Sequence, residues 1–412
     1  MNRVLCIFED KKVENFYPLT LTRPIYRLRC GITTLEEKIS SISSQEEIYL
    51  ICRKYLSGVT SQKIEKAKVN PLEDLNERNL LFVNGRLLFL EERIDLEGGE
   101  EVGVKRGEIV YARLNRKTLK KLPFNNPEKV GEVLTQAKQM VEVKEIEANL
   151  LEYPWDIIKW NSYALRKEFE RKKEKGIKGK VDEGAYLINP EKIYIGKNST
   201  IEPGVLLNAE RGPIYIAEEV KINPPTVIEG PCYIGRGTIV DGAKIRQGCS
   251  VGSVCRIGGE IEESVFHAYV NKHHDGFIGH SYIGEWVNLG ALTTTSDLKN
   301  TYGSVKVFIK GKEVDTKQIK IGSFIGDYTK TGIGTLIDTG SVIGVASNIF
   351  GGGVTPKFIP SFSWGGKDGF VENRLDKVIE VARIVMERRG VKQTEEDRNL
   401  LKKIYQLTRE ER

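Results

Sequence analysis

From residue 181 to about residue 365 the chain repeats an aliphatic residue every six positions, a period that few folds can satisfy. The repeat occurs in two runs, which are Ile239, Ile245, Val251 and Ile257, and then Ile319, Ile325, Thr331, Ile337, Ile343 and Ile349. A period of six fits neither an amphipathic helix nor a lone strand, but it fits a solenoid in which three six-residue faces close one triangular coil. The aliphatic residues then point inward and stack between coils, whereas glycine, asparagine and aspartate occupy the corners, where they adopt a positive φ at little cost.

We therefore predict a left-handed β-helix over residues 181–365. The repeats are interrupted at about 258–276 and 291–318, and such insertions project from a corner without disturbing the stacked core. Long loops on a rigid scaffold are places where binding groups gather. Residues 366–412 return to a helical period, which predicts a helical tail that packs against the end of the β-helix or a neighbouring subunit and caps its edge.

The front of the chain, residues 1–154, alternates apolar runs with polar helical ones. Residues 4–8, 48–51 and 80–83 are predicted to be buried strands, and residues 34–39 to begin a helix. This alternation indicates an α/β domain. Residues 155–180 are densely charged, which predicts a solvated connecting helix that ends at Gly176.

Composition limits the class of protein. The 412 residues suffice for two or three domains, and 40% apolar with 29% charged residues is typical of an ordinary globular protein. No stretch is apolar enough to cross a bilayer and the start lacks a signal-peptide core, so we expect a cytoplasmic protein without a membrane partner. The six scattered cysteines predict reduced packing residues. The net charge of +6 fits a solvated surface or anionic small substrates, and no basic stripe with interleaved aromatic residues indicates a nucleic-acid partner.

All four histidines lie between His267 and His280, and His273 and His274 stand beside the first interruption. Histidine is the natural general base near neutral pH, and acyl transfer from a thioester to an amine needs such a base. Two alternatives stay open: ordinary surface or interface residues, or zinc ligands between subunits. Candidates for contacting the substrate or cofactor nearby are Asn288, Lys299 and Asn300.

Residues 276–293 (GFIGHSYIGEWVNLGALT) resemble the acetyltransferase half of the bifunctional glucosamine-1-phosphate acetyltransferase/N-acetylglucosamine-1-phosphate uridyltransferase family. An ungapped alignment places the catalytic histidine of the family on His274, a sugar-contacting asparagine on Asn288 and a tyrosine on Phe277. The resemblance implies that His274 takes the proton from the amine of glucosamine-1-phosphate as it attacks acetyl-CoA. It also implies a homotrimer, with the acyl donor between two subunits.

Residues 17–24 (YPLTLTRP) and 28–39 (LRCGITTLEEKI) are similar to the start of a sugar nucleotidyltransferase. They most resemble the variant branch of the bifunctional family that occurs in Bacteroidetes and some thermophiles, which also shares the motifs NGR at 84–86, PWD at 154–156 and SDLKNTYG at 296–303. The resemblance covers nearly the whole chain. It implies a Rossmann-like nucleotidyltransferase domain in front of an acyltransferase β-helix.

Nucleotidyl transfer needs backbone amides and basic groups around a triphosphate, usually with carboxylates that hold Mg²⁺. The first strand continues into EDKK at 9–12 without the glycine-rich loop of the common form, and the metal-binding aspartate aligns with Arg86. Asp156 or Asp10 is the predicted carboxylate for Mg²⁺. The nucleotide and phosphate contacts implied by the resemblance are Arg23, Arg29, Gly31, Lys38, Asn84 and Gly85.

The function that this combination predicts is synthesis of a nucleotide-sugar, most plausibly UDP-N-acetylglucosamine, by acetyl transfer and then condensation with UTP. One alternative is a sugar-1-phosphate nucleotidyltransferase of other specificity, such as a glucose-1-phosphate thymidylyltransferase using dTTP, with a β-helix that does no chemistry. Another is a scaffold that binds sugar nucleotides without turnover. A front domain that survives only as a structural relic is the third.

Overall fold

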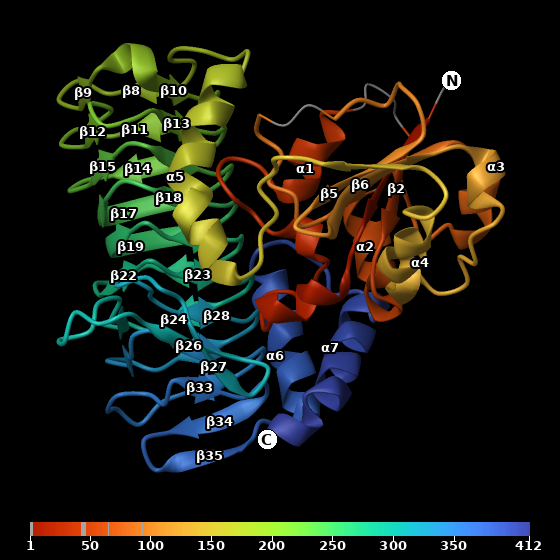
Figure 1. The fold of residues 1–412 in the computed structure, drawn as a ribbon. Coiled ribbons are helices and arrows are strands. Elements are labelled where there is room, and N and C mark those ends of the chain that lie inside the picture. The colour runs from red at the N-terminus through yellow and green to blue at the C-terminus, as the bar shows by residue number, and fades with distance from the viewer. Residues whose placement is uncertain (1–2, 43–46, 65, 92–93) are drawn as a thin grey trace. The chain divides into compact units, whose positions relative to one another are not determined.

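The structure is a computed structural model that describes residues 3–42, 47–64, 66–91 and 94–412 (Figure 1). Contacts between Cα atoms divide these residues into two units. The α/β unit holds residues up to 16, 22–28 and 33–153, and the β-helix unit holds 17–21, 29–32 and 154–412. Among the helices in these ranges, none is both long and apolar enough to cross a membrane.

The α/β unit is built on a seven-stranded sheet of order β3-β2-β1-β4-β6-β5-β7. The strands are β1 (Val4–Phe8), β2 (Ile48–Ile51), β3 (Ala67–Val69), β4 (Leu80–Asn84), β5 (Glu101–Lys105), β6 (Glu108–Leu114) and β7 (Glu142–Glu145). Strand β1 pairs in parallel with β2 and β4, whereas β6 is antiparallel to β4 and β5. All residues of β1 and β4 are buried, which is why both read as continuous apolar runs. The three predicted strands are confirmed.

In the described part of this unit, four α-helices cover the sheet or connect its strands, namely α1 (Leu35–Ser40), α2 (Ser57–Lys63), α3 (Arg116–Leu119) and α4 (Val130–Ala137). The predicted start at residue 34 is confirmed, because Thr34 caps α1. Its hydroxyl accepts from the Glu37 amide at 3.3 Å, and the Glu37 carboxylate accepts from the Thr34 amide at 2.6 Å. The buried residues of α4 belong to the same core as β1, β4 and β6.

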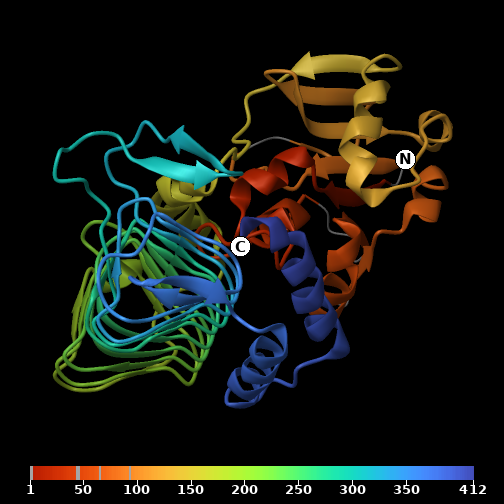
Figure 2. The ribbon, with the colours of Figure 1, turned by 90° about the horizontal axis from the view of Figure 1, so that it is seen from below.

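The β-helix unit stacks its coils so that parallel strands form three faces, and the coils are seen end-on in Figure 2. Face 1 holds β10 (Ile193–Ile195), β13 (Ile214–Ile216), β16 (Cys232–Ile234), β18 (Cys249–Val251), β20 (Val265–Phe266), β23 (Tyr282–Ile283), β28 (Phe324–Ile325), β31 (Val342–Ile343) and β33 (Phe358–Ile359). The left-handed parallel β-helix predicted from the period is confirmed.

Faces 2 and 3 share two long strands, β17 (Ile239–Ile245) and β19 (Arg256–Glu262), which bend across the corner between them. Face 2 also holds β8 (Lys180–Val181), β11 (Thr200–Ile201), β14 (Lys221–Asn223), β21 (Asn271–Lys272), β24 (Asn288–Leu289), β29 (Lys330–Thr331), β32 (Asn348–Ile349) and β34 (Ser363–Gly366). Face 3 also holds β9 (Tyr186–Ile188), β12 (Leu206–Asn208), β15 (Val227–Glu229), β22 (Phe277–Gly279), β25 (Thr294–Thr295) and β30 (Leu336–Ile337).

Most of the predicted inward residues form the core of the β-helix, including Ile245, Val251 and Ile257. Two were wrong. Ile239 points outward and its neighbour Val240 takes the inner place, while Ile319 is 55% exposed. Successive side chains of a strand point to opposite faces, so a slip of one residue exchanges core for surface.

The first predicted interruption is wrong. Residues 258–276 contain part of β19 and all of β20 and β21, and Ser250 pairs directly with Val265 in the next coil. This coil is shortened, not opened by a loop. The second interruption, predicted at 291–318, is confirmed for its later part, because an antiparallel hairpin of β26 (Lys306–Ile309) and β27 (Lys312–Asp315) leaves the coil there, whereas Thr294 and Thr295 still pair with the next coil.

The corner between faces 1 and 2 carries one residue with positive φ in each coil, and we call this row the left-handed corner. Its members are Asn198, Glu219, Gly237, Val254, Tyr269, Trp286, Tyr328, Ala346 and Phe362. The prediction of glycine, asparagine or aspartate at the corners holds for Gly242 between faces 2 and 3 and for Asn198 and Gly237 in this row, but it is wrong for the other members of the row. Backbone bonds between coils hold the turn, such as that from the Tyr269 amide to the Ser253 carbonyl at 2.9 Å, and they offset about 1–2 kcal/mol of strain per residue.

Helix α5 (Pro154–Arg171) lies along the outside of face 1. Its Leu165 and Phe169 pack on a ladder of stacked tyrosines that includes Tyr194 and Tyr215, whose ring centroids are 4.5 Å apart. The prediction of a solvated helix ending at Gly176 is therefore wrong, because α5 ends at Arg171 and buries its apolar stripe in this unit.

The tail begins as a strand and not as a helix. β35 (Gly369–Glu372) pairs antiparallel with β34 and covers the edge of the last coil, so residues 366–372 depart from the predicted helix. The helical part follows as α6 (Leu375–Glu387) and α7 (Glu395–Leu407). These helices pack beside the lower coils, where the rings of Phe362 and Tyr405 lie 5.1 Å apart.

Candidate functional site

A cleft of about 260 Å³ opens in the α/β unit where β1 and β4 end. In open α/β sheets, ligands bind outside the carboxyl ends of the strands. The residues that line the cleft include three lysines, Lys11, Lys12 and Lys138, and four carboxylates, Asp10, Glu108, Glu128 and Glu132. Lys11 pairs with Glu132 and Lys12 pairs with Glu108, so the lining is of mixed charge, and an anionic ligand would compete with these carboxylates for the lysines.

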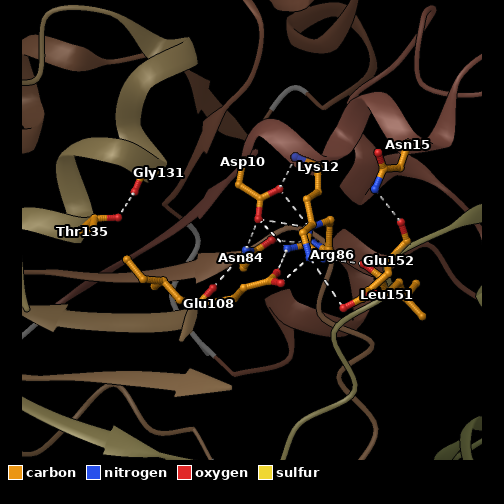
Figure 3. A network of polar contacts seen from close by, with 11 residues as sticks. Asp10, Lys12, Asn15, Asn84, Arg86, Glu108, Gly131, Thr135, Leu151 and Glu152 are labelled. Carbon is orange, nitrogen blue, oxygen red and sulfur yellow. Dashed lines mark hydrogen bonds and ion pairs between the residues drawn. The ribbon is translucent and has the colours of Figure 1, made fainter. Parts of the chain in front are cut away.

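Arg86, whose side chain has no exposed surface, contacts two residues of the cleft lining, Asp10 and Glu108 (Figure 3). Its Nε and one terminal nitrogen donate to the two oxygens of Asp10 at 2.9 and 2.6 Å, a bidentate pair. The same terminal nitrogen donates to Glu108 at 2.7 Å, and the other donates to the Leu151 carbonyl at 2.5 Å. Asn84 adds a bond of 2.8 Å to Asp10. The guanidinium therefore bridges two carboxylates.

The bridge keeps both carboxylates charged. Burial alone would raise the pKa of Asp10, but the hydrogen bond and charge of Arg86, with help from Asn84, hold it below its usual range. Burial would likewise raise the pKa of Glu108, and contacts with Lys12 and Arg86 lower it. Both groups are ionised at neutral pH.

These residues do not fit Mg²⁺, which takes oxygen ligands in octahedral geometry. Arg86 already occupies the space between Asp10 and Glu108 and uses their oxygens. Within the described part of the chain, no three His, Cys, Asp or Glu side chains gather in a way that could hold a metal ion. Asp156, the other predicted ligand, lies in the first turn of α5 in the β-helix unit.

The pH dependence of stability tests this network. Asp10 and Glu108 have lowered pKa values when folded, so their contribution is complete above the unfolded values of about 4 and is lost as pH falls through the folded ones. We expect the urea midpoint of the α/β unit to drop below about pH 4. In Arg86→Met the two carboxylates lose their partner and their pKa values rise, so stability should instead increase as pH falls from 7 toward 5. Equal pH profiles for the two proteins would contradict the bridge.

The other residues predicted to bind nucleotide lie in different places. Gly85 adjoins the cleft and donates to the Phe8 carbonyl at 2.8 Å. Arg23 and Lys38 are buried in the α/β unit outside the lining of the cleft, and the Lys38 ammonium donates to the Thr33 carbonyl at 2.9 Å. The lysines at positions 11 and 12, which do line it, stand in the EDKK segment that follows β1. Their place at the carboxyl end of a central strand was the signal that could have identified them.

Arg29 and Gly31 belong to the β-helix unit. Arg29 lies over the ring of Tyr233 at 5.3 Å. Gly31 has a φ of +81° and donates to Asn161 of α5 at 2.6 Å. A Cβ at Gly31 would lie 2.2 Å from the Glu168 carboxylate, so this glycine allows the close approach of α5.

In the β-helix, His274 is exposed at the corner between faces 2 and 3. Its main-chain carbonyl accepts a hydrogen bond from Lys272, whose ammonium also donates to the Gly258 carbonyl at 3.2 Å. Lys272 pairs with Ile257 and occupies an inward position, where burial lowers its pKa to about 8. An interior ammonium thus holds the turn that presents His274. The six-residue period did not predict a lysine at position 272, because the equivalent inward position is aliphatic in other coils.

A second histidine has a carboxylate partner. His280 Nδ1 lies 2.7 Å from Asp297 Oδ2, the geometry that orients an imidazole and leaves its Nε2 available. Burial tends to raise the pKa of Asp297, but the hydrogen bond and charge of His280 and the charge of Lys320 lower it. The sequence did not identify Asp297 as a partner of His280. Their pairing depends on the number of residues in the coil between them, which the repeat pattern does not give.

The other residues predicted to contact the substrate or cofactor lie on two faces of the β-helix and in the insertion that holds β26 and β27. Phe277 lines a groove of about 540 Å³ on face 3 together with Lys244, Glu260 and Asp275. Asn288 lies on face 2, where it accepts from Asn271 at 2.6 Å. In the insertion, Lys299 donates to the Ser304 carbonyl of its own loop and Asn300 is exposed.

Known proteins resemble this chain over parts of its length. Residues 5–176 match the sugar nucleotidyl transferase family. The chain is 38% identical over 95 residues to the bifunctional sugar-1-phosphate nucleotidylyltransferase/acetyltransferase of Sulfurisphaera tokodaii, covering 23% of this chain and 24% of that protein. It is 30% identical over 233 residues to the bifunctional protein GlmU of Methanococcus maripaludis, covering 53% of this chain and 50% of that protein.

The chain therefore spans half or less of the length of these two relatives. Among solved structures, a UDP-N-acetylglucosamine acyltransferase shares 15% identity at a TM-score of 0.27, covering 56% of this chain and 89% of that one.

Proposed function

We propose that this protein makes a nucleotide-sugar, with the α/β unit transferring a nucleotidyl group to a sugar-1-phosphate and the β-helix unit acetylating the sugar amine. The observation that carries the proposal is the cleft at the carboxyl ends of β1 and β4, which is lined by lysines and carboxylates and lies within the segment that matches sugar nucleotidyl transferases. The bifunctional relatives support the pairing of the two activities. The finer assignment to the variant branch rests on the motifs NGR, PWD and SDLKNTYG.

In the α/β unit, an oxygen of the sugar-1-phosphate attacks the α-phosphorus of UTP or dTTP, and pyrophosphate leaves. Lys11, Lys12 and Lys138 would neutralise the phosphates, the role first assigned to Arg23 and Arg29. Asp10 and Glu108 are engaged by Arg86 and so do not hold a divalent ion themselves. Such an ion would enter the cleft together with the nucleotide.

In the β-helix unit, the amine of glucosamine-1-phosphate attacks the thioester carbonyl of acetyl-CoA. His274 takes the proton from the amine and returns it to the sulfur of coenzyme A as the carbon–sulfur bond breaks. Its exposure at a corner held by Lys272, beside the face 3 groove with Phe277, supports this role. We further propose a homotrimer, which light scattering of the purified protein at several concentrations would test.

Pyrophosphate release tests the nucleotidyl transfer. The full chain is offered UTP or dTTP with N-acetylglucosamine-1-phosphate or glucose-1-phosphate, with and without Mg²⁺. We expect release with one pairing, and a loss of at least tenfold in Lys12→Gln, since a charge-assisted phosphate contact is worth about 1.5–3 kcal/mol. Nucleotide binding without release from any pairing would favour a sugar-nucleotide scaffold instead.

A further inference from the structure

Lys272 is a charged side chain in the interior of the β-helix. It stands at an inward position of β21, where its register partner on β19 is Ile257, and only 1% of its surface is exposed. Strand β24, the next strand of face 2, contributes Leu289 to the same core. An ammonium among aliphatic side chains loses its hydration, which disfavours the charged form. Burial accordingly lowers the pKa of Lys272 to about 8, although the charge of Asp275 tends to raise it.

The ammonium of Lys272 joins two adjacent coils. It donates to the Gly258 carbonyl on β19 at 3.2 Å and to the carbonyl of His274 at the corner between faces 2 and 3. The ammonium has room because residue 259 is a glycine with a φ of +69°, and a Cβ there would lie 2.8 Å from Lys272 Nζ. A Cβ at Gly258 would lie 2.0 Å from the carbonyl oxygen of His273. The two glycines therefore let the lysine tie the His274 corner to the preceding coil.

This arrangement opposes stability. Because the pKa of Lys272 is lowered on folding, the unfolded chain binds more protons between about pH 8 and the unfolded value of about 10.4, and stability rises with pH across that window. Below that window the folded chain carries the whole penalty of a buried charge. An apolar side chain of similar length would avoid the penalty. A residue that breaks the local pattern in this way is expected where function requires it.

The charged and titratable groups around Lys272 lie on the outer side of the β-helix, and all are at least partly exposed. They are Asp241 on β17, Arg256 and Glu260 on β19, and His273, His274 and Asp275 in the turn that follows Lys272. Strand β24 contributes only Asn288 and Leu289. The carboxylate of Glu260 is engaged by Arg246 at 2.6 Å. The His274 carbonyl therefore has its ammonium partner on the inner side of the turn, apart from these groups.

We propose that Lys272 is a positioning residue for acetyl transfer, which fixes the His274 corner against the preceding coil and so sets the direction of the His274 ring. Lys272 does not touch the substrate and acts through the main chain of His274. This inference rests on the proposed role of His274 as general base. It also gives the reaction an alkaline limit, because a neutral amine is a weaker donor than an ammonium and holds the carbonyl less firmly once the pH passes about 8.

Steady-state kinetics of the full chain with acetyl-CoA and glucosamine-1-phosphate test the effect on acetyl transfer. In Lys272→Met we expect kcat to fall roughly 10–10²-fold, because misplacing a catalytic group by about 1 Å costs up to about 10²-fold. KM for both substrates should stay within about twofold, since no substrate contact is removed. Lys330→Met is the matched control. It removes an ammonium on β29 whose pKa burial also lowers to about 8, but which donates to the Tyr328 carbonyl in the left-handed corner at 3.0 Å. The control should keep its kcat.

Nuclear magnetic resonance reports the placement of His274 without any turnover. The chain has four histidines, so labelling their ring Cε1 atoms with ¹³C gives four signals, which single histidine-to-alanine variants assign. We expect the His274 signal to move in Lys272→Met, and those of His267 and His280 to stay in place. In the natural chain the His274 signal should show a step as the pH rises through about 8, and Lys272→Met should lack that step.

An unchanged kcat in Lys272→Met, or an unchanged His274 signal, would overturn the proposal. Urea unfolding separates placement from folding, because removing the buried charge should leave the chain as stable or more stable. A urea midpoint for Lys272→Met well below that of Lys330→Met would make Lys272 a structural residue only and would also overturn the proposal. If the natural chain transfers no acetyl group, the proposed function fails, and the His274 signal still decides whether Lys272 fixes this corner.

Discussion

Replacing Arg86 by methionine is expected to lower the free energy of unfolding of the α/β unit by about 3–5 kcal/mol. The variant keeps most of the buried side-chain volume but removes the guanidinium that donates to both Asp10 and Glu108 (Figure 3), leaving Asn84 and the Lys12 amide on Asp10 and the Lys12 ammonium on Glu108. Two carboxylates would then share one pocket at neutral pH. Breaking a buried pair is far more damaging than replacing it whole, because the remaining charges stay desolvated.

Urea unfolding at pH 7, followed by hydrogen exchange of β1 and β4, measures this effect in the unit concerned. Arg116→Met is the matched control, since Arg116 and its partner Glu77 are both about half exposed and such pairs contribute about 0–1 kcal/mol. A loss no larger than that of the control would show that Arg86 does not hold the two carboxylates.

The variant Arg86→Asp extends this test to metal binding. Three carboxylates would meet where the guanidinium now lies, so Mg²⁺ should raise the urea midpoint of this variant and leave that of the natural chain unchanged. Stabilisation of the natural chain to the same degree would contradict the conclusion that its own residues do not fit the ion.

Replacing His274 by alanine is expected to reduce acetyl transfer by about 10²–10⁴-fold, the range that a positioned general base contributes. The side chain is exposed, so the fold should persist, and pyrophosphate release by the α/β unit should be unchanged. Release of the coenzyme A thiol, measured with glucosamine-1-phosphate and acetyl-CoA, reports the acetyl transfer.

His280→Ala is the decisive comparison, because His280 has a carboxylate partner in Asp297, whereas within the described residues the ring of His274 contacts no carboxylate. If His280→Ala abolishes transfer while His274→Ala preserves it, the base is the His280–Asp297 pair. Loss in His274→Ala alone supports the assignment from the resemblance. His273→Ala serves as the matched control, since its ring lies beside that of His274 at 5.2 Å.

The parts of the fold that depend on short sequence periods could be predicted from the sequence. Continuous apolar runs identified β1 and β4, and the six-residue period identified inward residues such as Val251 and Ile257. The slip from Ile239 to Val240 arose because strand alternation, not strict spacing, decides which side chain points inward.

The sites depend on contacts that no local pattern records. Asp10 and Arg86 are 76 positions apart, and their meeting requires the order of strands in the sheet. Lys272 is a lysine at an inward position, which the alternation of apolar and polar residues would assign to solvent. The pairing of His280 with Asp297 depends on coil lengths that vary along the β-helix.

The left-handed corner has a consequence for how the chain can change. Because bonds between coils impose the positive φ, valine, tyrosine, tryptophan and phenylalanine all adopt the same backbone there. At each position of this row, the backbone therefore keeps the same conformation whichever side chain it carries. Tyr269 and Trp286 are two members of this row, and both line a groove of about 250 Å³ together with Arg388 and Arg389. A substitution at a single position of the left-handed corner can therefore change which ligands this protein prefers, while the β-helix keeps its conformation.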